Sequence, residues 1–595
     1  MSVTKRKGVF LKIYRKTMRL IMECCPKYYF ISQFFLLIET LLMILLIIIT
    51  QQVFDGMMML AQDASHIWSV TRWIGLFMLI SIGRSALNAI ENHRFTVLGQ
   101  RMEAFISRKI AEKTAKLDPI VFEKTQTLDE INKASGAVDA LFVTGNGING
   151  AAVIIVPFFL FMAIYLHQHH PLLIWVIILV ITPKSLTLLM KVKLYTRLED
   201  RSAPLRREAK SYEEAMIDRK FFKETRSWGA VDYFKEKYLF AVSLLNLQTW
   251  KTDATATGLN LLMTLISAIG YLGVVYVLFL TLRDGEISVG VFAAVLGSLS
   301  TQMIWMMDFL AYQLEVILKN AGKVIYLVDF FDLPEKMGNA KMLDWTSDIV
   351  FKDVGFTYPD ATSPALKGIN LSIKANETVA LVGENGSGKS TLTKLLLGLY
   401  EPTEGQIFVG GVDLSTVDPF VRFKGISAVF QKFQRYELSL KENICLADVD
   451  SEVGIGYSAQ LAGVKIGEET YPQGEDTVLS REFGGIDLSG GQWQRVAIAR
   501  GIYRDHQLIV LDEPTSAIDP FEERRLYTQF ANMTRDKTAI IVTHRLGSAK
   551  IADRIVVMSK AEIVEIGTHE SLMENKGVYA MMFNVQQHWY QEEVI

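Results

Sequence analysis

Cysteine is scarce in this chain: Cys24, Cys25 and Cys445 are the only ones among 595 residues. Such an odd and sparse set does not build a disulfide framework, so a small disulfide-stapled domain is excluded. A large charge of one sign is also missing, because the formal net charge is only −2. We therefore expect no nucleic-acid partner. Cys24 and Cys25 lie beside basic residues and are expected on the reducing side of a membrane, as buried and unreactive thiols.

Apolar residues are in excess. Half of the residues are hydrophobic and the mean hydropathy is +0.22, which is unusual for a soluble protein. A helix needs about 20 apolar residues to cross the hydrocarbon core of a membrane. Six candidate runs occur, all before residue 319: 29–50, 71–91, 148–167, 171–190, 254–282 and 287–318. A buried helix of a soluble protein could imitate one of them but hardly six, so the first part of the chain, residues 29–330, is predicted to be a six-helix membrane domain.

The distribution of Lys and Arg predicts the orientation of these spans. Residues 1–28 are rich in both, so this N-terminal segment is expected in the cytoplasm, as a helix lying on the membrane surface. It is not a cleavable signal peptide, because the apolar run that follows is too long. The segments 51–70 and 167–170 hold no Lys or Arg and are expected outside. The long, charged segments 92–147 and 191–253 are expected to be two cytoplasmic, helical excursions continuous with the spans.

A few polar side chains fall inside the predicted spans: Glu39, Arg84, Asn88, Lys184 and Asp308. Ionisable groups inside a membrane are costly and usually face a cavity or one another. Glu39 and Asp308 are the better candidates for lining a polar pathway. Arg84 and Lys184 lie near span ends, where a long side chain can also reach the interface, and both interpretations stay open.

The character of the sequence changes after a linker at residues 331–345. The stretch "DIVFKDVGFTY" alternates like a strand. Short, β-branched apolar runs follow in "ETVALVG", "QLIVLDE", "TAIIVTH" and "RIVVMSKAEIVEIG", and each ends at a turn or a polar loop. This arrangement is typical of an α/β nucleotide-binding domain, which we place at residues 346–595.

The stretch "GENGSGKS" at 383–390 fits the pattern G-x-x-x-x-G-K-[ST] between a strand and a helix. Gly383, Gly386 and Gly388 allow the backbone to curl so that its N–H groups point at phosphate oxygens. Lys389 supplies a cation for the β- and γ-phosphates, and Ser390 offers a hydroxyl to Mg²⁺. The sequence therefore predicts a site for ATP and Mg²⁺.

An acidic pair ends the apolar run in "LIVLDE". Asp512 is expected to hold Mg²⁺, as the corresponding carboxylate does in phosphate-loop enzymes. Glu513 follows directly and is expected to act as the general base on the water that attacks the γ-phosphate. The presence of this Glu indicates genuine hydrolysis.

With these motifs, residues 346–585 resemble the nucleotide-binding domain of ABC transporters, which is an α/β P-loop NTPase domain with a helical signature subdomain. The resemblance implies that Tyr358 stacks on adenine, that Gln431 contacts Mg²⁺ and the attacking water, and that His544 contacts the γ-phosphate. It also implies that "LSGGQ" at 488–492 is the family signature and that Asp519, in "SAID" at 516–519, belongs to the D-loop. The expected nucleotide-binding set is completed by Asn385, Ser387, Thr391, Ser489, Gly490, Gly491 and Gln492.

In this family two such domains pair head to tail, and the signature of one closes over the ATP held by the other. One chain then holds two half-sites, so the resemblance implies a dimer with a second copy of the chain or with a related half-transporter. The six-span domain ahead of one nucleotide-binding domain resembles an ABC exporter half-transporter. Coupling helices that press on the ATP domains are expected near 118–124 and 214–222.

The cargo is less well defined. Trp493 and "REFGG" at 481–485 resemble the sequences of exporters of lantibiotic-type and other small modified peptides in Gram-positive bacteria. Sequence divergence without any bearing on the cargo explains the same residues equally well. Aromatic and Met residues such as Phe158, Met162, Trp305 and Met306 either line an amphipathic cavity or pack against helices and lipid. No peptidase domain is expected ahead of the first span. We expect an ATP-driven exporter of an amphipathic substrate in the bacterial plasma membrane; a lipid or multidrug exporter, a siderophore importer and an ATP-gated regulator are the alternatives.

Overall fold

The computed structural model describes residues 3–124, 130–131, 134, 136–336, 338–339, 343–359, 361–467, 469–514, 520–534 and 536–592. The chain divides into two compact units. The first, here called the helical unit, comprises Met1–Thr114 and Asp129–Leu333. The second, here called the α/β unit, comprises Ala115–Leu128 and Pro334–Ile595. A short stretch from the first half of the sequence thus folds with the second half.

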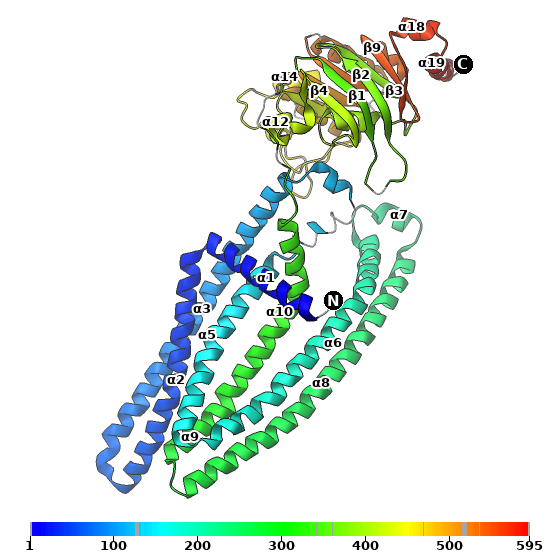
Figure 1. The fold of residues 1–595 in the computed structure, drawn as a ribbon. Coiled ribbons are helices and arrows are strands. Elements are labelled where there is room, and N and C mark those ends of the chain that lie inside the picture. The colour runs from blue at the N-terminus through cyan, green and yellow to red at the C-terminus, as the bar shows by residue number, and fades with distance from the viewer. Residues whose placement is uncertain are drawn as a thin grey trace. The chain divides into compact units, whose positions relative to one another are not determined.

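The helical unit is built of helices, and the longest of them run alongside one another (Figure 1). In chain order they are α1 (Val3–Cys24), α2 (Pro26–Gln62), η1 (Ala64–His66), α3 (Ile67–Ala115), α5 (Val138–His169), α6 (Leu172–Ile217), α7 (Phe222–Ser227), α8 (Val231–Arg283), α9 (Val289–Gly297), η3 (Ser298–Met303) and α10 (Ile304–Phe331). The last predicted span, 287–318, covers α9, a π-helical turn at η3 and the start of α10.

In the part of the chain that the structure describes, five helical segments are long and apolar enough to cross a membrane. They are Pro26–Gln62, Ala64–Ala115, Val138–His169, Val231–Arg283 and Val289–Leu310. The remaining predicted span, 171–190, falls on α6, where the side chains of 172–181 lie outside the description. The count of six therefore stays a prediction.

Three helices continue far beyond the length that a membrane requires. α3 has 49 residues, α6 has 46 and α8 has 53, whereas about 20 suffice to span the hydrocarbon core. The prediction that the charged excursions are helical continuations of the spans is confirmed for these helices. The segment 214–222 is not a separate helix: α6 ends at Ile217, and the side chain of Asp218 accepts a hydrogen bond from the Lys220 N–H and fixes a turn before α7.

Some of the polar side chains expected within the spans contact one another. Glu39 on α2 lies 3.6 Å from the Arg84 Nε on α3 and accepts a hydrogen bond from Asn88 Nδ2 at 3.3 Å. Arg84 therefore pairs with Glu39. Asp308 is exposed on α10, and the side chain of Lys184 lies outside the described part.

A buried cluster from α2, α5, α8, α9 and α10 forms the core of the helical unit. Phe158, Met162 and Met306, which the sequence offered as cavity-lining residues, belong to this cluster and are at most 1% exposed. The packing interpretation is therefore the right one for them. Trp305 is about half exposed and stacks on Phe309.

The adjacent thiols of Cys24 and Cys25 are half-buried instead of fully buried, with their sulfurs 3.0 Å apart. Both are free. Burial raises the pKa of the Cys24 thiol to about 12, so this thiol is a poor nucleophile, as expected.

Two sheets form the centre of the α/β unit. The antiparallel sheet has the order β2-β1-β4-β5 and the larger sheet the order β10-β9-β3-β8-β7-β6. Neighbours in the larger sheet pair in parallel, except for β10 at its edge. The strands are β1 (Ile349–Phe356), β2 (Leu366–Ile373), β3 (Thr378–Gly383), β4 (Glu404–Val409), β5 (Val412–Asp413), β6 (Ile426–Val429), β7 (Leu508–Asp512), β8 (Thr538–Val542), β9 (Arg554–Ser559) and β10 (Glu562–Gly567).

Helices surround these sheets. They are η2 (Pro119–Glu123), α11 (Lys389–Leu396), η4 (Leu414–Thr416), α12 (Pro419–Arg422), α13 (Leu440–Cys445), α14 (Gly456–Leu461), η5 (Gly474–Asp476), α15 (Gly490–Tyr503), α16 (Pro520–Met533), α17 (Leu546–Ala549), α18 (His569–Glu574) and α19 (Val578–Glu592). A second apolar core packs α13, α14 and α15 against β6, β7 and β8 of the larger sheet and includes Trp493, which is 3% exposed. The three helices correspond to the predicted helical subdomain, and Trp493 is one of the residues that pack them against the sheet.

The parallel strands explain how distant segments meet. β3, β7 and β8 are buried at every residue, which accounts for their continuous apolar sequence. β8 lies between β3 and β7 in the sheet. Since parallel strands end at the same edge of a sheet, the loops after Gly383, Asp512 and Val542 emerge side by side.

Candidate functional site

The loop at 383–390 connects β3 to α11 and depends on its glycines. Gly388 has φ +103° and caps the N-terminus of α11, a conformation that an L-residue with a Cβ avoids. A Cβ on Gly383 would stand 2.1 Å from the carbonyl oxygen of Met558. The loop can therefore curl tightly at the positive end of α11, as the pattern predicted.

Lys389 lies in the curve of this loop and is 5% exposed. Its Nζ donates hydrogen bonds to the carbonyl oxygens of Gly383, at 2.9 Å, and of Glu384, at 2.8 Å. Burial lowers the pKa of the Lys389 ammonium, while the nearby carboxylates of Glu513 and Asp512 oppose that shift. The cation is therefore held where an anion bound in the loop would meet it.

Two oxygen ligands meet at the start of α11 and the end of β7. Ser390 Oγ donates to Asp512 Oδ1 at 3.4 Å. Asp512 is 7% exposed, and burial raises the pKa of its carboxyl group. A hydroxyl and a carboxylate are ligands that Mg²⁺ accepts alongside substrate phosphates and water. The donor set therefore fits Mg²⁺, although no group of three or more His, Cys, Asp or Glu suited to a metal occurs among the described residues.

Two residues predicted to be catalytic, Gln431 and His544, contact the carboxylate of the third, Glu513. Gln431 Nε2 donates to Glu513 Oε2 at 2.6 Å, and His544 Nε2 lies 2.6 Å from Glu513 Oε1. Gln431 follows β6, Glu513 follows β7 and His544 follows β8, so three neighbouring strands deliver them. Burial and the charge of Lys389 lower the pKa of His544, while Glu513 raises it.

Glu513 has an unusual backbone. Its φ is +50°, a region that few non-glycine residues adopt, and its N–H donates to the carbonyl oxygen of Val542 at 3.0 Å. Residues held in such conformations cluster at functional sites, where the surrounding structure enforces them. The motif predicts the role of Glu513, but nothing in the sequence indicates its strained conformation.

Tyr358 stands beside α11. Its hydroxyl hydrogen-bonds the Thr391 hydroxyl at 3.1 Å, and its ring packs edge-to-face on Phe356 and Tyr400. The ammonium of Lys394 lies 5.8 Å from its centroid. The aromatic ring is thus fixed next to the helix that begins at the phosphate loop.

The signature residues lie at the start of α15. Ser489 and Gly490 are exposed at the N-terminus of α15, and a Cβ on Gly490 would meet open space. Ser489 Oγ accepts a hydrogen bond from the Gln492 N–H, and Gln492 Oε1 accepts one from the Ser489 N–H. The polar contacts of this pair therefore form a helix cap. Asp519 lies outside the described residues.

The motifs do not indicate the contacts that Glu123, Lys394 and Tyr400 make near the site. The sequence predicts only that the segment 118–124 is a coupling helix. This segment contains η2, whose Glu123 accepts a hydrogen bond from the Tyr400 hydroxyl and lies 3.6 Å from Lys394 Nζ. Burial and Glu123 raise the pKa of Tyr400. The contact between Glu123 and Tyr400 spans 277 positions in the sequence, and no local pattern indicates it.

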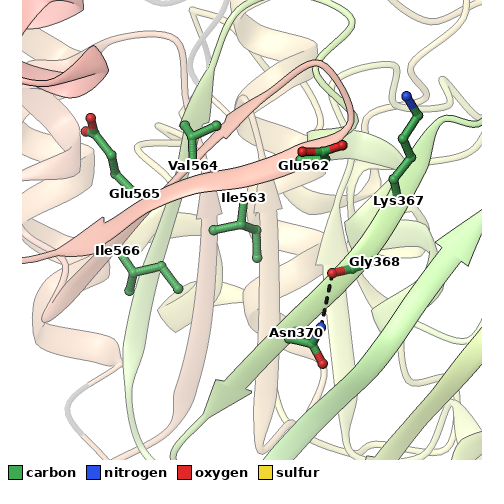
Figure 2. A pocket seen from close by; sticks show the side chains of 8 residues that line it. All are labelled: Lys367, Gly368, Asn370, Glu562, Ile563, Val564, Glu565 and Ile566. Carbon is green, nitrogen blue, oxygen red and sulfur yellow. Dashed lines mark hydrogen bonds between the residues drawn. The ribbon is translucent and has the colours of Figure 1, made fainter.

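A separate hollow of about 510 Å³ lies between β2 and β10 (Figure 2). Its lining comes from the edge strands of the two sheets, and Asn370 Nδ2 donates there to the Gly368 carbonyl at 3.1 Å. Val564 and Ile566 are exposed in it, with Lys367, Glu562 and Glu565 around them. None of the predicted site residues lines this hollow.

Comparisons with known proteins agree with this geometry. Residues 366–516 match the family described as ABC transporter, and residues 29–307 match the ABC transporter transmembrane region. The chain therefore belongs to the ABC transporters, with a membrane domain fused to one ATP-binding domain. Membership implies nucleotide binding by the α/β unit and makes the chain a multi-pass membrane protein.

Two curated transport proteins are similar to this chain. The chain is 34% identical to the subtilin transport ATP-binding protein SpaT of Bacillus subtilis over 373 residues, which are 61% of this chain and 60% of that protein. It is 35% identical to the leukotoxin translocation ATP-binding protein LktB of Mannheimia glucosida over 51% of this chain and 43% of that protein. The chain thus spans less than two thirds of these curated relatives.

The fold is that of a solved bacterial Atm1-family ABC exporter with ATP bound. The two structures match with a TM-score of 0.78 over 93% of this chain and 98% of that one, at 22% identity. The predicted ABC exporter fold is therefore confirmed.

Proposed function

We propose that this protein is an ATP-driven exporter that moves an amphipathic substrate, a small or modified peptide, out of the cytoplasm. The observation that carries the proposal is the convergence of Gln431, Glu513 and His544 beside a complete phosphate loop. Each group has the chemistry that ATP hydrolysis requires, and none is replaced by an inert residue. The enzyme activity is that of an ATPase coupled to transport.

Binding of ATP uses the curl of residues 383–391. The backbone N–H groups of the loop and the N-terminus of α11 receive the phosphates, and Lys389 exchanges its carbonyl partners for β- and γ-phosphate oxygens. Tyr358 stacks on the adenine. Ser390, Gln431 and Asp512 would hold Mg²⁺, which would neutralise charge on the phosphates.

Hydrolysis uses the carboxylate of Glu513. This group accepts a proton from the water that lines up with the γ-phosphate, while Gln431 orients that water. His544 holds Glu513 at one oxygen and contacts the γ-phosphate. The burial that lowers the pKa of His544 favours its neutral form, in which one ring nitrogen donates and the other accepts.

A second copy of the chain completes the site. The exposed Ser489 and Gly490, together with Gly491 and Gln492, then close over the ATP of the partner. ATP favours this closed dimer because it contacts the signature only there, and a ligand shifts an equilibrium by its differential affinity for the two states. Hydrolysis removes the bridge and reopens the dimer.

Closure reaches the spans through the coupling segments. The contacts of η2 with Lys394 and Tyr400 support this role for residues 118–124, because Lys394 lies on the same helix as Lys389 and Ser390. The segment at 214–222, where α6 ends and α7 begins, is the second coupling segment of this proposal. The basic N-terminus and the α/β unit lie in the cytoplasm of a bacterial cell, and alternating access exchanges inward and outward openings.

The relatives support a peptide as cargo, since one is named for subtilin transport and another for leukotoxin translocation. We test this by reconstituting the protein in nanodiscs and measuring ATP hydrolysis with cationic modified peptides, lipids and hydrophobic drugs. Stimulation by peptides, and ATP-dependent uptake of the same peptides into inverted vesicles, are expected. Stimulation by lipids or drugs alone would favour the alternative exporters, uptake in the opposite direction an importer, and unstimulated slow turnover a regulator.

A further inference from the structure

The loop that carries His544 is held from several sides. Its preceding residue, Thr543, donates its N–H to the Leu381 carbonyl at 3.2 Å and accepts the Arg545 N–H on its hydroxyl at 3.0 Å. Arg545 also pairs with the buried Glu523 of α16. These contacts fix the residues on either side of His544 but leave its own carbonyl group to another partner.

That partner is Gln586, which lies in the middle of α19. Its Nε2 donates to the carbonyl oxygen of His544 at 2.5 Å, and its Oε1 accepts the N–H of Leu546 at 3.0 Å. A side-chain amide offers a donor at one atom and an acceptor at the other, so one orientation satisfies both contacts. The two bonds clamp the three-residue stretch 544–546 from 40 or more positions away.

The helix that presents Gln586 is itself anchored. Glu565 of β10 accepts the N–H groups of Val578, at 2.6 Å, and of Tyr579, at 3.1 Å, at the start of α19. Tyr579 is fully buried in one apolar cluster with Leu546 and Ala549 of α17, and Phe583 packs against that cluster. Side chains on a rigid and packed element hold a site more closely than side chains on a mobile one.

We propose that Gln586 is a positioning residue for His544, a role that rests on the proposed ATPase function. Holding the carbonyl of His544 and the N–H of Leu546 fixes the peptide planes on both sides of Arg545. The imidazole Nε2 is thereby kept 2.6 Å from the Glu513 carboxylate. Gln586 acts through His544 and has no contact of its own with the reacting atoms.

The primary test compares Gln586→Leu with Gln587→Leu in the full-length reconstituted protein. Gln587 is the exposed neighbour on the same helix and provides a control with the same change in chemistry. We expect Gln586→Leu to lower kcat about ten- to a hundredfold, because small displacements of catalytic groups have effects of that size. KM for ATP should change by less than about twofold, since the interaction matters after binding. Gln587→Leu should keep the wild-type kcat.

A double-mutant cycle distinguishes positioning from general stabilisation. With His544→Ala in place, single-turnover hydrolysis should show no further loss when Gln586→Leu is added, because the two residues act as one unit. Independent losses would refute the positioning role, and so would a wild-type kcat in Gln586→Leu. Gln586→Met, which conserves length, should behave like Gln586→Leu.

A measurement without turnover keeps the proposal separate from the proposed function. Hydrogen exchange at the Leu546 amide should become faster in Gln586→Leu and stay unchanged in Gln587→Leu. If the wild-type protein does not hydrolyse ATP, the ATPase proposal is wrong. The exchange rate at Leu546 would still show whether Gln586 holds the stretch 544–546. Unchanged exchange at Leu546 would show that the clamp does not exist in solution.

Discussion

The two glycine-rich stretches of the α/β unit differ in what surrounds them. In "GENGSGKS" the side chains of Ser387 and Lys389 are buried, and Lys389 is bound to carbonyls of the same loop. In "LSGGQ" the residues Ser489 and Gly490 are exposed, and the polar contacts of Ser489 close on its own helix. The first stretch is a cradle built by its own chain. The second presents donors outward, which is the arrangement that a shared site between two copies requires.

The largest effect is expected on the cradle side, at the group that activates water. Glu513→Gln should lower kcat about 10²- to 10⁴-fold, the usual contribution of a general base, while ATP still binds. Its amide still fits between Gln431 and His544, so the fold is retained. Hydrolysis is measured by phosphate release and binding by a fluorescent ATP analogue.

The control for this variant is Glu562→Gln, which changes an exposed carboxylate in the hollow of Figure 2. It should hydrolyse ATP at the wild-type rate. Normal turnover in Glu513→Gln would remove Glu513 from the role of base.

On the signature side, Ser489→Arg should lower hydrolysis about 10²- to 10³-fold, as the loss of a charge-stabilising donor does. ATP binding to the monomer should persist, because the cradle is untouched. Ser439→Arg is the matched control: Ser439 caps α13 with the same capping box but belongs to no predicted site. It removes a cap of the same kind and should leave hydrolysis intact.

Mixing variants sharpens the contrast between the two stretches. Lys389→Ala should be inactive alone, and so should Ser489→Arg. A dimer of one copy of each variant has one site with both intact halves, so activity should reappear on co-reconstitution. If the mixture stays inactive, or if Ser489→Arg alone is fully active, the shared site is wrong.

The sequence predicted the residues of the nucleotide site better than the contacts that other elements make with them. The pattern at 383–390, the acidic pair at 512–513 and the strand ends before them are local features, and the structure brings them together at one sheet edge. Glu513's positive φ and the Gln586 clamp depend on residues contributed by other elements, so no spacing indicates them. The burial of Trp493 cannot be read from a single sequence. From its identity alone, Trp493 therefore suggests a resemblance to peptide exporters and not a packing role.

A smaller effect is expected at the base-binding residue of the cradle. Tyr358→Ala should raise KM for ATP roughly 5- to 150-fold, the equivalent of about 1–3 kcal/mol of stacking on a base. The kcat should remain close to that of the wild type. Tyr358→Phe keeps the ring and loses only the contact with Thr391, so its KM should stay near the wild-type value; a loss equal to that of Tyr358→Ala would exclude stacking.

The smallest effect is expected for Glu123→Gln, which tests whether the nucleotide site is coupled to the membrane domain through η2. Glu123→Gln removes the charge that faces Lys394, an exposed ion pair worth about 0.2–1 kcal/mol. Basal hydrolysis should therefore stay within about fivefold of the wild type, while stimulation by a transported peptide should fall further than basal activity does. Glu112→Gln, which breaks an exposed pair with Arg108 within α3, is the matched control and should keep full stimulation. Equal stimulation in both variants would mean that η2 packs on α11 without transmitting the state of the nucleotide, and coupling would then have to run through the segment at 214–222.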